Sequence, residues 1–224
     1  MLGVYTFVFS VIFKARWGND LSDNSRLGFA LTLFTGLIAF NIFNESISKA
    51  PGLIIRHPNY VKKVVFPLEI LPVTSLGSAV VNSLFSILML LTVALISRHT
   101  LPWTLIFLPL MYLPLIFFCL GLSWFLASLG VFVRDIGQFI GVVLRILFFL
   151  TPIVYPSTRI PANFQFILYI NPLTFIVNHF RRVILWGQIP DWGDYIIITA
   201  ATGLVCLLGY IWFMKSKKTF ADVI

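Results

Sequence analysis

One arginine lies in a strongly apolar part of the sequence, among residues that would share one face of a helix. Arg145 falls inside the run LRILFFLTPIVYP, residues 144–156. Steps of three and four residues stay on one helical face. Arg145 therefore shares a stripe with an amide, two phenyl rings, a glycine and a proline: Gln138, Phe148, Phe149, Gly141 and Pro152.

The cost of a charge in an apolar stretch determines how this stripe is interpreted. An arginine within a bilayer faces a bundle interior or a water-filled cavity, and Arg145 lies about ten positions into its apolar run, too deep to reach an interface easily. The alternative is a structural arginine that bonds helix-end carbonyls or a carboxylate, for which Glu45 and Glu69 are the nearest candidates. We expect a wet path lined by the stripe and the tyrosine that follows it: Gln138, Arg145, Phe148, Phe149 and Tyr155.

The composition indicates that the chain lies in a lipid bilayer. Of its 224 residues, 59% are hydrophobic and 11% are charged, whereas soluble domains have about 25% charged residues. A chain of this length cannot bury so much apolar surface in its own core, so we expect an all-α, multi-pass membrane protein in contact with lipids. The formal charge of +8 suits anionic headgroups. The basic residues are spread between apolar runs, so nucleic acid is not an expected partner.

No residue pattern indicates a metal site, a disulfide or a catalytic centre. Cys119 and Cys206 lie in separate apolar runs, as small buried side chains do. His57, His99 and His179 are far apart and have no ligand spacing. Paired carboxylates, a nucleophile elbow and a Gly-rich phosphate loop are absent from the sequence. We therefore expect neither an enzyme nor a cofactor in this chain, and any energy source must lie in another chain.

Five apolar runs are long enough to cross a hydrocarbon core of about 30 Å, which takes about 20 helical residues. They are Leu27–Ile47, Ile70–Ile96, Trp103–Val133, Ile136–Tyr155 and Tyr195–Met214. The opening MLGVYTFVFSVIF is apolar but too short to cross, and it lacks the basic region and cleavage site of a signal peptide. We interpret it as part of a first span whose beginning is missing, which makes six spans.

Lysine distribution predicts the orientation of these spans. Six of the seven lysines lie either in the loop Ser48–Pro67 or in the tail after the last span. Arginines nearly balance the count, but loops rich in positive charge tend to stay in the cytoplasm. We therefore place this loop and the C-terminus on the cytoplasmic side.

The loop Ser48–Pro67 is the longest basic connection, with the sequence SKAPGLIIRHPNYVKKVVFP. Asn59 can cap a short helix that Pro67 would stop. The alternative is a solvated loop held against anionic headgroups. A surface that mixes basic, aromatic and aliphatic side chains instead favours docking to a partner, through Arg56, His57, Asn59, Tyr60, Lys62 and Lys63.

A helical hairpin is predicted over residues 160–187, between the fifth and sixth spans. Pro161 fits the first turn of one helix. Asn171 is then a cap residue, and Pro172 fits the first position of a second helix that Gly187 would end.

Neither helix of this hairpin is long enough to cross a bilayer, since their lengths are about 14 and 22 Å. We expect them to enter the outer half of the membrane and return. Non-helical backbone at that depth is tolerated only where it contacts protein or water. The alternative is an interfacial hairpin that lies flat, with Arg181 and Arg182 at the headgroups.

Five motifs are spread in order over nearly the whole chain. They are KKVVFPLEILP (62–72), LGVFVRDIGQ (129–138), FFLTPIVYP (148–156), INPLTFIVNHFR (170–181) and KTFADVI (218–224). Together they resemble the permease subunit of bacterial ABC-2 type exporters, most closely the branch that exports O-antigen, capsule or teichoic acid.

The resemblance implies a homodimer of six-helix subunits in the bacterial inner membrane, with two copies of a separate ATPase that binds ATP and Mg²⁺. It implies that Ser48–Pro67 is the coupling helix on that ATPase. It also implies that Ile160–Trp186 forms outer gate helices, in which the sequence singles out Asn171, Pro172, Arg181 and Arg182. The implied cargo is a glycan on undecaprenyl diphosphate, whose phosphates suit charge-assisted hydrogen bonds from Arg145, Arg181 and Arg182.

Two other functions fit parts of the sequence. One is an ABC-2 exporter of a drug or a small lipid. The other is a membrane enzyme that handles polyprenyl phosphates, which would need acids or histidines facing the lipid phosphate, and the acids here are few and dispersed. Members of the family begin with a cytoplasmic amphipathic helix ahead of the first span, and we expect this sequence to lack it.

Overall fold

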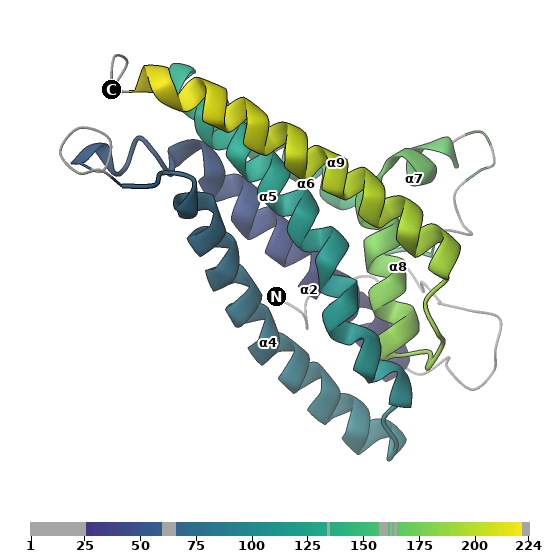
Figure 1. Cartoon of the computed structure of the whole chain (residues 1–224). Helices are drawn as coiled ribbons and strands as arrows, with labels where there is room; N and C mark the ends of the chain where they lie inside the picture. Colours follow the sequence, from purple (N-terminus) through teal and green to yellow (C-terminus); the bar gives the residue numbers. More distant parts are fainter. Residues whose placement is uncertain are drawn as a thin grey trace. The chain divides into compact units, whose positions relative to one another are not determined.

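The computed structural model describes residues 26–59, 66–133, 135–156, 161, 163 and 165–220. Within these ranges the chain is all-helical and contains no strand (Figure 1). The predicted incomplete first span lies outside the described residues.

Among the residues that the structure describes, four helices are long and apolar enough to cross a membrane, and they coincide with four of the predicted spans. Each has 24 to 29 residues, and at about 1.5 Å per residue each exceeds a core of about 30 Å. A 3-10 helix, η3 (Trp103–Phe107), precedes the third of them. The four are α2 (Arg26–Lys49), α4 (Ile70–Arg98), α5 (Leu108–Phe132) and α9 (Trp192–Ser216).

The helix of the fifth predicted span is shorter than expected. α6, Ile136–Leu150, has 15 residues and ends before Tyr155. The hydroxyl of Thr151 donates to the Leu147 carbonyl at 2.8 Å, and Pro152 has no N–H with which to continue the helix. At about 22 Å, α6 alone does not cross the hydrocarbon core.

Two short helices follow, α7 (Phe166–Ile170) and α8 (Pro172–Ile184). They confirm the predicted break at Asn171. Gly187 adopts a φ of +61° after α8, in the left-handed region where glycine avoids the strain of a side chain.

Packing divides the chain into two compact units, and α2, α4, α5, α6 and α9 each contribute to both. The first unit comprises the chain up to Phe40, Leu84–Met111 and Leu147–Tyr195. The second comprises Asn41–Ser83, Tyr112–Ile146 and Ile196–Ile224.

The core of the first unit is built around α8. Its apolar side chains are buried along most of the helix, among them Ile176, Val177 and Phe180. The hydroxyl of Thr104 on η3 donates to the Val183 carbonyl at 2.7 Å, which ties the segment ahead of α5 to α8.

In the second unit, α5 and α9 run side by side with their backbones in contact (Figure 1). A Cβ added at Gly209 would overlap the carbonyl oxygen of Gly121, and one at Gly121 would lie 2.5 Å from the carbonyl oxygen of Val205. Glycine at both positions therefore allows an approach that any side chain would prevent.

Candidate functional site

The predicted stripe on α6 lies largely on the exposed face of that helix. Gln138, Arg145 and Phe149 are exposed, whereas Ile140 and Leu144 are buried. The opposite, apolar face of α6 is therefore partly buried. The exposed face also includes apolar side chains: Phe139, Val142 and Ile146.

Arg145 makes no hydrogen bond or ion pair with any residue that the structure describes. The two carboxylates considered as structural partners are paired with lysines. Glu45 lies 2.6 Å from Lys49, and Glu69 lies 2.7 Å from Lys217. Neither carboxylate therefore pairs with Arg145, and no group in the described part of the chain binds its guanidinium.

Phe148 and Tyr155 are less open than the rest of the predicted path. The Phe148 ring packs edge-on against Phe40, with 5.2 Å between the ring centroids. The Tyr155 side chain is half-buried, and its hydroxyl donates to the Phe149 carbonyl at 2.7 Å. Tyr155 therefore satisfies a carbonyl at the end of α6, where no helical N–H can reach it.

Asn171 performs the predicted capping role at the start of α8. Its side-chain oxygen accepts from the Leu173 N–H at 3.0 Å, and Pro172 occupies the first turn. The Asn171 amide also donates to the Thr151 hydroxyl at 2.9 Å. One buried side chain thus caps α8 and binds it to the turn after α6.

Arg181 is fully buried, and backbone carbonyls surround its guanidinium. Nε donates to the Thr32 carbonyl at 3.2 Å, Nη1 to Pro152 at 2.7 Å and Nη2 to Ile153 at 2.9 Å. Pro152 and Ile153 follow the end of α6, where carbonyls lack helical donors. Hydrogen bonds from a cation are strong and offset part of the cost of burying it.

This placement corrects the expectations for Arg181. Its side chain is enclosed within the first unit and bonded to carbonyls, so its guanidinium is not exposed to headgroups or to a phosphate. Gly36 leaves room for it, since a Cβ there would lie 2.8 Å from Nη2. The sequence did not predict a role for Gly36 or for Thr151. The only local signal for Thr151 is the Thr-Pro pair in FFLTPIVYP.

Arg182 differs from its neighbour. It is half-buried, and its Nε is buried without a hydrogen-bond partner among the described residues. A buried donor without a partner is unfavourable, so an anion or a water molecule at this position would satisfy it.

The structure describes the predicted docking loop as far as Asn59. Arg56, His57 and Asn59 are exposed there. Pro58 and Asn59 are already helical, so the helix starts earlier than predicted and Asn59 is not the residue that precedes it. Tyr60, Lys62 and Lys63 lie outside the described residues.

Comparison with known proteins shows the family of this chain. The model of the ABC-2 type transporter family matches residues 1–185. The chain belongs to the ABC-2 type transporter family.

Three relatives of this ABC-2 chain bear the name O-antigen export system permease protein RfbA. Two are from Klebsiella pneumoniae, with 26% and 25% identity, and one is from Myxococcus xanthus, with 22% identity. Each alignment covers 99% of this chain and 82% of the relative.

Family membership identifies this ABC-2 chain as a multi-pass membrane protein. It also implies a separate ABC ATPase as partner. The region matched by the family model includes α6, the turn after it and all of α8, so the contacts of Arg181 lie inside that region.

Proposed function

We propose that this chain is the membrane-spanning subunit of an ATP-driven exporter that moves a lipid-linked polysaccharide across the bacterial inner membrane. The observation that supports it is the similarity to O-antigen export permeases over 99% of the chain. ATP and Mg²⁺ would bind to two copies of a separate ATPase. Family membership alone would fit a drug or small-lipid exporter equally well.

The proposed topology has six spans and a re-entrant hairpin at residues 160–187 within one permease domain. α7 has 5 residues and α8 has 13, so their lengths of about 8 and 20 Å fall short of a core of about 30 Å. Irregular backbone within a membrane must be enclosed by protein or border water, and the burial of Asn171 at the break between the helices satisfies this condition. The hairpin would form the outer gate.

The proposed path lies between two copies of the chain, beside the exposed face of α6. Arg145 and Gln138 lie on this face, and a guanidinium that faced acyl chains would be costly. Water between two subunits is a more favourable environment for it. There Arg145 could donate charge-assisted hydrogen bonds to the phosphates of undecaprenyl diphosphate. The exposed ring of Phe149 could contact sugar rings without binding them tightly.

Arg182 is the better candidate for a phosphate contact at the hairpin. Its Nε has no partner among the described residues, whereas the donors of Arg181 already bond three carbonyls. In the proposed gate, Arg181 therefore holds the fold together, and Arg182 offers its positive charge to the phosphate.

The loop Ser48–Pro67 is the proposed docking site for the ATPase. Its exposed described residues include Arg56 and His57, and the lysine distribution favours a cytoplasmic position for it. The same argument favours a cytoplasmic C-terminus.

Deleting the gene from its host tests the proposed function. Surface polysaccharide should disappear, and the lipid-linked glycan should accumulate inside the cell. A plasmid copy of the complete gene should restore the surface polymer, but not in a strain whose partner ATPase is inactive.

Two results would contradict this proposal. Surface polysaccharide that is unchanged in the deletion strain would exclude glycan export by this chain. If the same strain also became sensitive to hydrophobic compounds, the small-molecule exporter would be favoured.

A further inference from the structure

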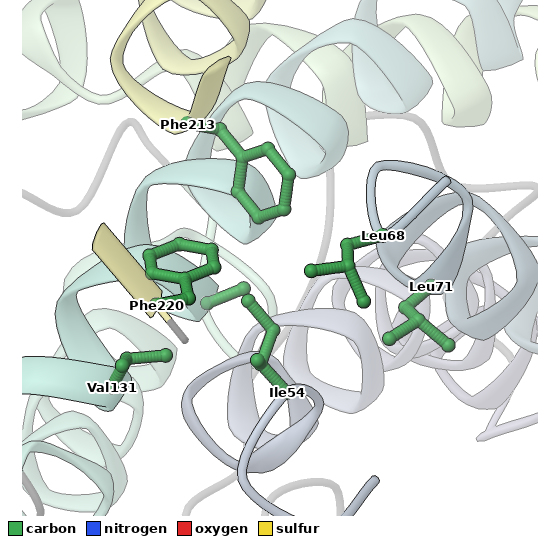
Figure 2. Close-up of a cluster of buried hydrophobic side chains, with 7 residues drawn as sticks. Ile54, Leu68, Leu71, Val131, Phe213 and Phe220 are labelled. Carbon is green, nitrogen blue, oxygen red and sulfur yellow. The ribbon is translucent and has the colours of Figure 1, made fainter. Parts of the chain in front are cut away.

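Both ends of the loop Ser48–Pro67 meet the C-terminal segment in one buried cluster (Figure 2). Phe220 follows α9 and the short helix η6, Lys217–Thr219. Ile54 and Phe220 have no exposed surface, and in Figure 2 their side chains point towards the same space. We call this group the loop-base cluster: Ile54, Leu68, Leu71, Ala127, Val131, Phe213 and Phe220.

An ion pair joins the end of the loop to the same C-terminal segment. Lys217 Nζ lies 2.7 Å from Glu69 Oε2. Trp124 on α5 donates from its indole N–H to the Glu69 carbonyl at 3.0 Å. Burial raises the pKa of Glu69, but the hydrogen bond and the charge of Lys217 outweigh it, so this pKa lies below its ordinary value. The carboxylate is therefore charged at neutral pH, as the pair requires.

The start of the loop is held by direct backbone packing on α5. A Cβ added at Gly130 would overlap the carbonyl oxygen of Pro51, which belongs to η2 (Ala50–Gly52). Beyond this contact, Arg56 and His57 are exposed. The loop thus has a buried base and an exposed outer part.

We propose that Glu69, Lys217 and Phe220 are positioning residues that fix the loop base to α5 and α9. Packed interiors have low compressibility and transmit displacement. A movement of the ATPase against the exposed part of the loop would then shift α5 and α9 instead of bending the loop. This inference rests on the proposed function, because it requires a partner that moves the loop. It gives a role to the tail motif KTFADVI, whose Phe220 enters the cluster.

Hydrogen exchange on the purified full-length permease in nanodiscs tests the positioning directly. The backbone N–H groups of Arg56 and His57 donate to the carbonyls of Gly52 and Ile54. Lys217→Glu should speed exchange of the peptide with these amides roughly two- to fivefold, the range expected for an ion pair that is partly exposed. Glu69→Lys should act in the same direction, and the double charge swap should restore the wild-type rate.

Matched variants keep this measurement interpretable. Lys215→Glu makes the same charge change at an exposed position two residues away, and exchange should remain at the wild-type rate. If Lys217→Glu does not accumulate, Lys217→Gln removes the pair without placing two carboxylates together. Rates equal to wild type in both single variants, or no rescue in the double variant, would overturn the positioning role.

The ratio of ATP hydrolysed to glycan exported separates positioning from stability. In proteoliposomes that contain the partner ATPase, each single charge reversal should raise this ratio at unchanged levels of permease and bound ATPase. The double swap should return it to the wild-type value. A pair that only stabilised the fold would lower protein yield and export together and leave the ratio unchanged, which would overturn the inference.

The proposed function and this inference fail in different ways. A wild-type permease that recruits no ATPase would overturn the proposed function. The positioning role alone would be overturned by a different result. In that case the wild type recruits the ATPase, but Lys217→Glu equals wild type in the exchange rate and in the ratio of ATP hydrolysed to glycan exported.

Discussion

Two arginines in apolar surroundings, Arg145 and Arg181, occupy opposite environments in this protein. Arg181 is enclosed and donates to three backbone carbonyls. Arg145 is exposed on α6 and makes no bond to a described residue. The same side chain therefore has a structural role at one position and is open to a ligand at the other.

Removing Arg181 should destabilise the fold strongly. Arg181→Met would leave the carbonyls of Thr32, Pro152 and Ile153 without these donors in a buried site, a loss of about 2–4 kcal/mol in the free energy of unfolding. Arg182→Met is the matched control, with an expected loss below about 1 kcal/mol because its Nε has no partner to lose. SDS-induced unfolding of the purified proteins gives both values, and similar losses for the two variants would refute the distinction.

Replacing Arg145 should lower export without affecting folding. Arg145→Gln removes a cation that has no partner in the described part of the chain, so the amount of protein in the membrane should not change. We expect the rate at which polysaccharide appears at the cell surface to fall about tenfold, equivalent to about 1.4 kcal/mol of lost interaction with an anionic cargo. Arg145→Lys should give an intermediate rate, because lysine keeps the charge but loses the planar fork. Wild-type export by Arg145→Gln would remove Arg145 from the path.

Residue roles were predictable where the physical cause is local. Asn171 followed by proline identified a helix start from two adjacent residues, and the structure has that cap. The fate of Arg181 depends on Thr32, which is 149 positions away in the sequence. The residues next to an arginine in the sequence do not distinguish one that will be buried and bonded to backbone carbonyls from one that will remain exposed.

At the scale of elements, close packing of α5 and α9 depends on two glycines. Gly209→Ala would place a methyl group against the Gly121 carbonyl, and the helices would have to separate at a cost of about 1–3 kcal/mol. Gly203→Ala, on the same helix, adds a Cβ 3.8 Å from the Phe117 ring, an ordinary contact. It should be neutral or stabilise by up to about 1 kcal/mol through helix propensity. Unfolding in SDS measures both, and equal effects would show that this crossing is not close-packed.

The ion pair between the loop end and the tail should respond to acid. Because the pKa of Glu69 is lowered below its ordinary value of 4.5, the stabilisation from Lys217 is present above that pH and is lost as pH falls through the folded-state pKa. The difference in unfolding midpoint between wild type and Glu69→Gln should therefore be constant from neutral pH down to about 5 and shrink below about 4.5. A difference that grows in acid would mean that the carboxylate is not held by this pair.

The boundaries of elements were predictable to different degrees. Long apolar runs set the extents of α2, α4, α5 and α9, because a continuous apolar helix satisfies its own backbone in lipid. The end of α6 was not predicted from the sequence, because the apolar run continues to Tyr155. Thr151 and Pro152 are the local residues that mark this end. Hydropathy alone does not distinguish a helix from the buried turn that follows it.

For the molecule as a whole, membrane topology is the property on which the proposed function most depends. In the proposed topology, an even number of crossings separates the loop Ser48–Pro67 from the tail, so both lie on the same side of the membrane, and α7 with α8 return to the side from which they enter. Single cysteines in a background without Cys119 and Cys206 can test this. Four exposed positions suit the labels: His57, Leu101, Gln188 and Lys218.

A membrane-impermeant maleimide should label Leu101→Cys and Gln188→Cys in intact spheroplasts, because the proposed topology places both positions on the outer side. His57→Cys and Lys218→Cys should react only after permeabilisation, since both lie in the lysine-rich segments assigned to the cytoplasm. If the hairpin crossed the bilayer in full, Gln188→Cys would be protected and Lys218→Cys labelled from outside. That pattern would move the C-terminal segment away from the ATPase and separate it from the side of the coupling loop, which the contacts of Phe220 and Lys217 do not permit.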